Sequence, residues 1–328
     1  MAFEKSQLRK WLAEWQTLVG KNPALDAGDD VRELWPVASV HGERYYLKRL
    51  GSWRNLPVLS EYRMIVHLLE EGVRVPAFQL TDDGAVTAGP AEDSFVLMRD
   101  FEHEHVPAAE TPRFESEVGS ATAHLHRAMS RYSQPLGSYT EDIEGGITDR
   151  LRLSDDLLRR LDAVRDEILQ PLSQLPLQVV HGDFTPDNVL HLARGRGIGF
   201  IDFDHLPNAP RIWDIAKYLS RRIRFRWCQG VPTTVRMDCV EAFVAGYTKV
   251  VPLDQTETQS LPGAVLAYNV MEASYDQSIM DGVLPRRMLP DHAEVLQDTL
   301  QTIDWQLSNL DSVSVAVRRG KRNNNFTN

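Results

Sequence analysis

The fold is decided by LQVVHGDFTPDNVLHLARGRGIGFIDFD, residues 177–204. Its first four residues are apolar and predict a short strand, which runs into a His-Gly-Asp loop that ends at Asp183. Asn188 follows five residues after that aspartate. The remainder predicts a hairpin, in which the turn RGRG joins NVLHLA to IGFIDFD and the second strand delivers Asp202. The side chains of Asp183, Asn188 and Asp202 can therefore converge on one point.

Three oxygen-bearing side chains of this kind suit phosphoryl transfer from a nucleotide. One carboxylate accepts the proton of the attacking hydroxyl, while an amide oxygen and a second carboxylate hold Mg²⁺ ions that bridge the phosphates. The alternative is a polar turn whose Asp and Asn cap their own backbone. That alternative does not explain why Asp202 emerges from an otherwise apolar strand, because an isolated buried carboxylate is costly without a partner or a metal.

The pattern H-G-D-x4-N followed by I-D-F-D resembles the aminoglycoside phosphotransferase and choline kinase-like family, small-molecule kinases of the protein-kinase fold. Protein kinases carry H-R-D-x4-N and D-F-G in these places. This chain has Gly182 instead of that arginine and Asp204 instead of that glycine. The resemblance implies that Asp183 is the catalytic base and that Asn188 and Asp202 are metal ligands.

The same resemblance implies two supporting residues and a class of acceptor. His181 would support the catalytic loop, and Asp214, in RIWDIAKYL, would steady it by accepting backbone N–H bonds. Trp213 comes only eleven residues after Asp202 and no A-P-E follows, so the activation segment of a protein kinase does not fit. A small-molecule acceptor is therefore favoured over a protein acceptor.

A nucleotide site is implied in the N-terminal part of the chain. Lys48, in RYYLKRL, would clamp the α- and β-phosphates, and Glu61, thirteen residues on, would orient Lys48. Residues 96–100, with Met98 at their centre, would form the hinge strand whose backbone binds the adenine edge. The alternatives are an ordinary exposed strand lysine and a first-turn acid that favours the helix dipole.

The segment expected to cover the phosphates, DAGDDVREL at residues 26–34, departs from the family pattern because Gly28 is its only glycine. The co-substrate is therefore left as ATP or GTP. The same departure favours a second hypothesis from another class, a pseudokinase that binds nucleotide or a partner without catalysis. The presence of Asp183, Asn188 and Asp202 argues against that hypothesis.

Candidate acceptor-binding residues lie in two places. Asp204 and His205 directly follow the metal aspartate, and Tyr268 and Glu272 share one face of the helical segment AVLAYNVMEASYDQSIM, a region that lines the acceptor site in this family. The competing interpretation of that segment is a solvated helix face. The run RRIRFRW, residues 221–227, is able to bind an anion, but a surface helix is the default expectation.

Hydrophobic periodicity predicts a helix over 5–19, two strands within 31–50 with Pro36 on an edge strand, a helix capped by Ser60 and a strand over 94–101. Helices dominate the later sequence. The predicted fold class is therefore α+β, a protein-kinase-like fold with a small N-terminal α+β lobe and a larger, mostly helical C-terminal lobe.

The domain boundaries follow from this division. The N-terminal nucleotide-binding lobe is expected over 1–100, with a leading helix in residues 1–20, and the C-terminal catalytic and substrate-binding lobe over 101–310. The basic, weakly apolar residues 311–328 predict a disordered tail. Near the boundary, the H-x-H sequence at 103–105 is either a metal site or, preferably, a solvated connector.

Composition narrows the partners. The chain has 328 residues, and 36 basic against 46 acidic side chains give a formal charge of −10, which argues against nucleic acid as a partner. The acidic balance suits a cationic acceptor, such as an aminoglycoside-like antibiotic or another cationic metabolite, although amino alcohols, homoserine-like metabolites and sugars stay open. Two cysteines without metal spacing, no signal-type run and no stretch of about 18 apolar residues predict a cytoplasmic protein with no membrane association. Oligomeric state is left open.

Overall fold

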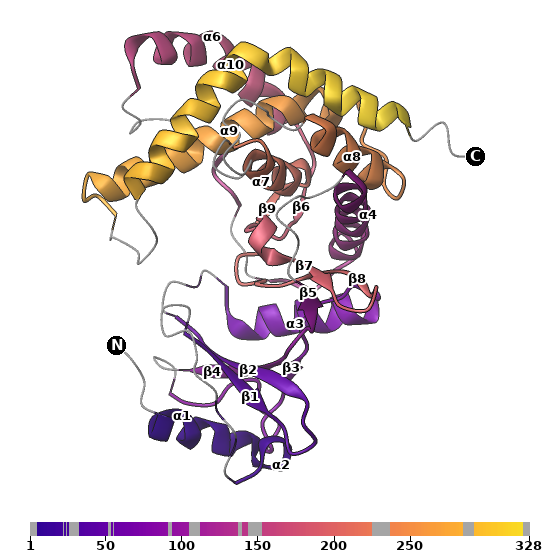
Figure 1. The fold of residues 1–328 in the computed structure, drawn as a ribbon, viewed down its shortest axis with the longest axis vertical. Helices are drawn as coiled ribbons and strands as arrows, with labels where there is room; N and C mark the ends of the chain where they lie inside the picture. Colours follow the sequence, from indigo (N-terminus) through magenta and orange to yellow (C-terminus); the bar gives the residue numbers. More distant parts are fainter. Residues whose placement is uncertain are drawn as a thin grey trace.

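A computed structural model shows a sheet-containing N-terminal part beneath a larger helical part (Figure 1). The structure describes residues 5–21, 23, 25, 33–51, 54, 56–90, 94–104, 112–136, 140–143, 153–224, 237–284 and 292–323. This arrangement is the predicted two-lobe α+β fold class.

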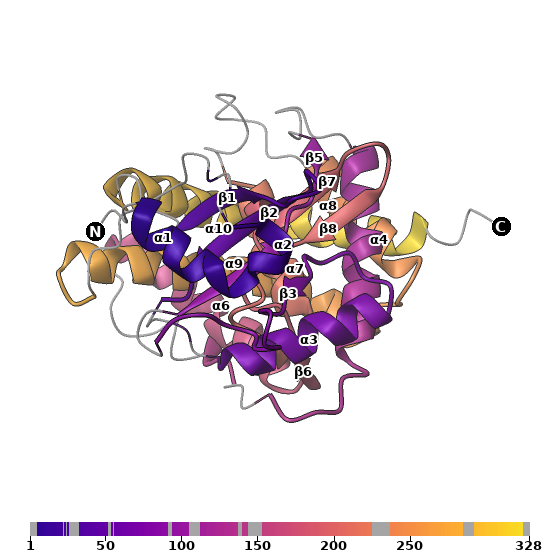
Figure 2. The same cartoon turned by 90° about the horizontal axis from the view of Figure 1, so that it is seen from below.

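The N-terminal part is a sheet covered on both faces (Figures 1 and 2). Its four antiparallel strands run in the order β1 (Leu34–Ala38), β2 (Arg44–Arg49), β4 (Phe95–Arg99), β3 (Phe78–Gln79). One face carries the predicted leading helix, which is divided into α1 (Lys5–Leu12), η1 (Ala13–Trp15) and α2 (Gln16–Val19). The other face carries α3 (Val58–Glu70), which lies between the sheet and the helical part.

The alternation of side chains along β4 explains how Lys48 reaches the interior. Phe95 and Leu97 belong to the apolar cluster beneath α1, whereas Val96 and Met98 pack with the first turns of α3. Lys48 is the register partner of Val96. Directly opposed residues of neighbouring strands share a face, so Lys48 projects to the α3 side, toward the rest of the molecule.

Two details of the N-terminal part bear on the sequence predictions. Pro36 lies in β1, which is an edge strand as expected, because proline has no N–H to donate to a second neighbour. The helix predicted to be capped by Ser60 begins earlier, at Val58 after Pro57. Ser60 is buried inside it and the N-cap is Pro57, so the prediction of a Ser60 cap was wrong by three residues.

The helical part is organised around one long buried helix. That helix is α9 (Gln255–Met280), which packs against α6 (Asp155–Ser173), α7 (Ile212–Arg222) and α10 (His292–Arg322) (Figure 1). Two further helices, α4 (Pro112–Met129) and α8 (Met237–Thr248), pack against each other at the side. Among the described helices none is long and apolar enough to cross a membrane.

Short strands between the lobes position the segment that decides the fold. The predicted hairpin is present as β7 (Val189–Leu192) and β8 (Gly197–Phe200), and β5 (His103–Glu104) adds to β7. Before it, β6 (Leu177–Val179) pairs with β9 (Asn208–Pro210), and η3 (Pro186–Asn188) leads into β7. The catalytic loop after β6 and the chain after β8 therefore run side by side.

The prediction of a disordered tail over 311–328 was wrong for residues 311–323, and residues 324–328 lie outside the described residues. Helix α10, which is interrupted at Asn309, continues to Arg322. Its later half buries Val313, Ala316 and Val317 in the main core. The spacing of these three residues is that of one helical face, a signal that the basic residues around them obscured.

The contact between α4 and α8 depends on two glycines. A Cβ at Gly246 would lie 1.9 Å from the carbonyl oxygen of Ser116, and one at Gly119 would lie 2.0 Å from that of Phe243. The helices therefore approach more closely than any larger side chain permits, and the obstacle is backbone rather than a flexible side chain.

We expect Gly246→Ala to destabilise the protein by about 1–3 kcal/mol, because the clash separates two helices and outweighs the better helix propensity of alanine. Urea unfolding followed by circular dichroism measures this loss. His124→Ala, on the exposed face of α4, is the matched control and should change stability by less than about 0.5 kcal/mol. Equal stability of the two variants would contradict the close contact.

Candidate active site

The loop after β6, which carries His181, Gly182 and Asp183, is fixed by hydrogen bonds to one buried carboxylate. Asp214, in the first turn of α7, accepts the backbone N–H groups of His181 at 2.7 Å and Gly182 at 3.0 Å. Nε2 of His126, on α4, lies 3.2 Å from the same carboxylate. Burial alone would raise the pKa of Asp214. The hydrogen bond to His126, the imidazoles of His126 and His181 and the backbone N–H of Gly182 hold that pKa below its ordinary value.

The backbone of the loop requires a glycine at position 182. Gly182 has a φ of +82°, and a Cβ there would lie 2.2 Å from Cδ of Pro207. Nζ of Lys217, also on α7, donates to the carbonyl oxygen of Gly182. The arginine that protein kinases carry at this place therefore does not fit, for a steric reason that is independent of any activation segment.

His181 connects the two halves of the site. Its Nε2–H donates to the carbonyl oxygen of Ile201 at 2.9 Å, and its Nδ1 accepts the N–H of Asp183 at 3.3 Å. The first bond ties the loop to the residue just before Asp202. The second bond fixes the backbone at Asp183. The imidazole therefore has a structural role in the loop.

Asp183 and Asn188 are in direct contact. The Nδ2 group of Asn188 donates to the backbone oxygen of Asp183 at 2.8 Å and to its Oδ2 at 3.0 Å. The carbonyl of Asn188 in turn accepts the N–H of Ile201 at 3.1 Å, which places the chain before Asp202 against the loop. Asp202 itself has a φ of +67°, an uncommon conformation that aspartate tolerates better than most residues.

Lys48 joins the two lobes. Its Nζ lies 2.5 Å from Oδ1 of Asp202. Burial would lower the pKa of Lys48, but Asp202, Asp204 and Glu61 together raise it. For Asp202 burial acts in the other direction, and the ion pair with Lys48 holds its pKa below the ordinary value. Both groups therefore stay charged at neutral pH.

Glu61 is fully buried on α3 and is hydrogen-bonded by the guanidinium of Arg54. Burial raises the pKa of Glu61, although Arg54 and Lys48 both oppose that shift. The carboxylate thus lies within electrostatic range of Lys48, while the ion pairs that these two residues make are with Arg54 and Asp202. The sequence reasoning did not consider Arg54.

The carboxylate of Asp204 interacts electrostatically with Lys48 and Asp202. Burial and the neighbouring carboxylate of Asp202 raise its pKa, against the effects of Lys48 and Arg54. Its Oδ1 is buried and makes no hydrogen bond to the described residues. His205 lies beside it, with Nε2 at 3.7 Å. Asp204 is therefore grouped with the residues predicted to bind nucleotide and metal, rather than with Tyr268 and Glu272.

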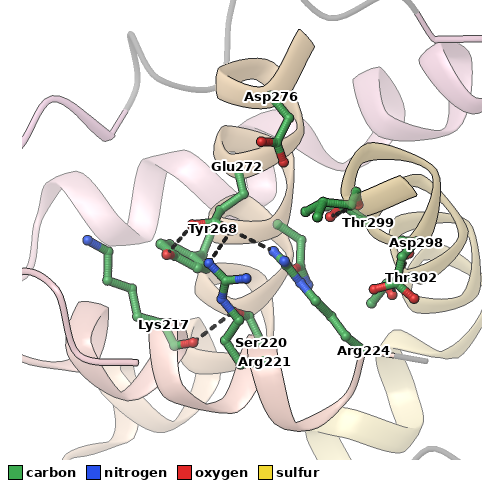
Figure 3. Close-up of polar contacts among 12 residues, drawn as sticks. Lys217, Ser220, Arg221, Arg224, Tyr268, Glu272, Asp276, Asp298, Thr299 and Thr302 are labelled. Atoms are coloured by element: carbon green, nitrogen blue, oxygen red, sulfur yellow. Dashed lines mark hydrogen bonds and ion pairs between the residues drawn. The ribbon is translucent and has the colours of Figure 1, made fainter. Parts of the chain in front are cut away.

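Tyr268 and Glu272 form a second cluster with two arginines (Figure 3). The hydroxyl of Tyr268 donates to Glu272 at 2.5 Å, and the same carboxylate lies 2.7 Å from Arg221 and 3.0 Å from Arg224. Burial would raise the pKa of Glu272, but the two guanidinium groups outweigh it and lower that pKa to about 2. We call Arg221, Arg224, Tyr268 and Glu272 the arginine cluster.

The positions of the arginines correct the expectation for the run at residues 221–227. The run at 221–227 was expected to lie on a surface helix, yet Arg222 and Arg224 are buried. Arg222 pairs with the buried Glu115 at 3.1 Å. Residues 225–227 lie outside the described residues. Three closely spaced arginines after an apolar helix were a visible signal, but their acidic partners are distant in sequence.

The donor set suits a hard divalent cation. Both amide hydrogens of Asn188 serve Asp183, so these bonds leave its Oδ1 uncommitted, and Asp202 and Asp204 supply carboxylate oxygens nearby. Within the part of the chain that the structure describes, no group of three or more His, Cys, Asp or Glu side chains is arranged to hold a metal. Few protein ligands supplemented by phosphate oxygens are what Mg²⁺ prefers, so the residues fit that ion.

The adenine-binding expectation for residues 96–100 stays a prediction. Met98 lies in the centre of the sheet, paired with Tyr46 and Phe78. The N–H groups of Arg99 and Asp100 already donate to backbone carbonyls. An adenine edge would have to use other backbone groups here. The glycine-poor segment around Gly28 and His105 of the H-x-H sequence lie outside the described residues.

The fold is shared with solved structures of small-molecule kinases. A microcompartment-associated aminopropanol kinase superposes with a TM-score of 0.71 at 18% identity, covering 95% of this chain and 99% of that one. An amicoumacin kinase in complex with AMP-PNP, Ca²⁺ and Ami superposes with a TM-score of 0.68 at 19% identity, covering 92% and 93%.

The model of the Phosphotransferase enzyme family matches residues 37–253, and the chain belongs to that family. This confirms the resemblance stated from the catalytic motif. A homoserine kinase from Phenylobacterium zucineum (strain HLK1) is 31% identical over 161 residues, which are 46% of this chain and 47% of that protein. The chain thus spans about half the length of such relatives in the matched region.

We expect Asp214→Asn to destabilise the protein by about 3 kcal/mol, because the amide leaves at least one buried N–H without an acceptor. The pKa of Asp214 is lowered on folding, so its contribution is present above its ordinary value of 3.8 and is lost as the pH falls through the folded value. The stability gap between wild type and variant should therefore narrow below about pH 4.

Denaturant unfolding at pH 7 and at pH 3.5 measures that gap. Asp166→Asn, an exposed carboxylate on α6, is the control and should behave as wild type. A gap that is small at pH 7, or that widens in acid, would contradict the anchoring role of Asp214.

Proposed function

We propose that this protein transfers the γ-phosphoryl group of ATP or GTP to a hydroxyl group of a small molecule. The observation that carries the proposal is the contact of Asp183 with Asn188 on a loop whose backbone is fastened to Asp214, with the Lys48–Asp202 pair beside it. Membership of the Phosphotransferase enzyme family supports it. Because the co-substrate is an intracellular nucleotide, we place the activity in the cytoplasm.

In the proposed reaction Asp183 accepts the proton of the acceptor hydroxyl. The acceptor oxygen forms a bond to the γ-phosphorus as the bond from that phosphorus to the bridging oxygen breaks, and the nucleoside diphosphate leaves. Lys48 positions the phosphates from the N-terminal lobe. Most of the acceleration in such a reaction comes from orientation and from charge placed in advance.

Asn188 and Asp202 would hold Mg²⁺, supported by Asp204, whose Oδ1 makes no hydrogen bond to the described residues. When bound, the ion neutralises charge on the phosphate oxygens. Burial of Asp204 without a hydrogen bond to that oxygen is otherwise unfavourable, which supports a cation at this place.

The names of the relatives favour a small acceptor. Homoserine is an amino acid with a hydroxyl group and aminopropanol is an amino alcohol, and both are far smaller than a polypeptide. An aminoglycoside-like antibiotic or another cationic metabolite is the broader class that the acidic composition suggested.

The second candidate, a pseudokinase, is favoured by one observation of the structure in addition to the glycine-poor segment. Glu61 is bonded to Arg54 rather than to Lys48, so the lysine–glutamate pair that catalysis requires in kinases is not formed directly. A protein of that kind would bind nucleotide without turning over any acceptor.

We expect Asp183→Asn to reduce acceptor-dependent release of nucleoside diphosphate by about 10²–10⁴-fold, because the hydroxyl loses its proton acceptor. The coupled assay is run with Mg²⁺ and a panel of amino alcohols, hydroxy acids, sugars and aminoglycosides. Asp187→Asn, an exposed aspartate on the same loop, is the matched control and should retain activity.

Nucleotide binding to both variants, followed by thermal shift, separates loss of chemistry from loss of fold. Wild-type protein that binds nucleotide but turns over no member of the panel supports the pseudokinase. Equal activity of Asp183→Asn and Asp187→Asn would overturn the role of Asp183.

A further inference from the structure

One guanidinium group of the arginine cluster, that of Arg221, has an N–H donor without a hydrogen-bond partner among the described residues. Arg224, just after α7, keeps only 1% of its side chain exposed and donates to Glu272 and twice to Asn269. Arg221, in the last turn of α7, is 21% exposed. Its Nε is buried and has no hydrogen-bond partner among the described residues. Arg224 is therefore held by the protein, whereas Arg221 retains donor capacity.

A single carboxylate serves both arginines. Figure 3 shows Arg221 and Arg224 meeting Glu272, with Tyr268 on the same helix. Glu272 also accepts the hydroxyl of Tyr268, so this one carboxylate is shared among three donors. A guanidinium group has five N–H donors in a planar fork that matches a carboxylate in two-point contact. One more carboxylate would complete the coordination of Arg221.

Arg221 also lies close to the proposed catalytic base. Burial lowers the pKa of Arg221, but Glu272, Tyr268 and also Asp183 raise it above its ordinary value. Burial, Glu272 and Asp183 likewise raise the pKa of Tyr268. Contacts also place the cluster beside the loop that carries Asp183: Nζ of Lys217, which donates to the carbonyl oxygen of Gly182, lies 5.4 Å from the centre of the Tyr268 ring.

We propose that Arg221 binds a carboxylate group of the acceptor, which makes the acceptor a small hydroxy acid or hydroxy amino acid. The inference rests on the proposed function, because it concerns the molecule whose hydroxyl reaches Asp183. The carboxylate would take up the donors of Arg221 that the protein leaves unused, while Arg224 keeps Glu272 in place.

The cluster is unsuited to a polycation. Glu272 is neutralised by two arginines, so it offers little attraction to an ammonium group, and Arg221 would repel one. Asp276 lies one turn further along α9 (Figure 3). Its carboxylate is paired with His292 at 2.9 Å. A single ammonium group could approach Asp276 while a carboxylate contacts Arg221. A zwitterion with a hydroxyl group therefore fits the charges better than an aminoglycoside does.

Three acceptors with the same hydroxyl chain test the proposal: homoserine carries both charges, 4-hydroxybutyrate only the carboxylate, and 3-amino-1-propanol only the amine. Binding is measured by calorimetry on the full chain with Mg²⁺ and a non-hydrolysable nucleotide. We expect both acids to bind at least about tenfold more tightly than 3-amino-1-propanol, because only they offer Arg221 a charged acceptor.

Arg221→Gln should weaken binding of the two acids by about 10- to 100-fold and leave 3-amino-1-propanol unchanged. Glu272 keeps Arg224 as a partner in this variant, so the cluster is not left with an unpaired buried carboxylate. Arg221→Lys should restore part of the affinity, since it keeps the charge but loses the planar fork. Arg113→Gln, an 88% exposed arginine on α4, is the control and should bind all three like wild type.

The outcomes separate this inference from the proposed function. Equal weakening of all three ligands by Arg221→Gln, tightest binding of 3-amino-1-propanol, or binding of none of the three would overturn the carboxylate site. Arg221-dependent binding of the acids without release of nucleoside diphosphate would support the site and contradict phosphoryl transfer. Turnover of homoserine that Arg221→Gln does not reduce would support phosphoryl transfer and contradict the carboxylate site.

Discussion

The buried carboxylate of Asp214 is the constraint on which the site depends. It accepts two successive backbone N–H groups of the loop that carries Asp183, while Lys217 of the same helix donates to the carbonyl of Gly182 that follows them. Asp214, Lys217 and Arg221 are spaced at three and four residues, so they lie along one face of α7. A single rigid helix thereby holds both the loop that carries Asp183 and the guanidinium that we assign to the acceptor.

The charged residues of the interlobe region form two groups, one around Lys48 and the other around Glu272. On the nucleotide side Lys48 and Arg54 face three carboxylates, an excess of negative charge that suits divalent cations. On the acceptor side two guanidinium groups share Glu272, an excess of positive charge among the direct contacts. Opposite local excesses in the two groups would orient a substrate with a hydroxyl at one end and a carboxylate at the other.

Much of the nucleotide side could be predicted from sequence because its residues are close together or in regular patterns. The five-residue spacing of Asp183 and Asn188 and the strand position of Lys48 are examples. The partner of Glu61 could not be predicted. Its carboxylate pairs with Arg54, which precedes α3 and belongs to no sequence motif. The arginine cluster was also out of reach, because Arg221 and Glu272 meet only through the packing of α7 on α9.

The net charge of −10 suggested a cationic acceptor, and the local structure points the other way. The net charge acts over long distances, whereas Arg221 acts by direct contact. Surface carboxylates more than about 8–10 Å from a ligand are largely screened at physiological ionic strength, so their sum governs solubility and encounter more than recognition. Arg221 acts over a hydrogen-bond length in a partly buried site, where screening is weak and geometry is selective. Where the global charge and one correctly placed guanidinium disagree, the guanidinium decides which acceptor is held.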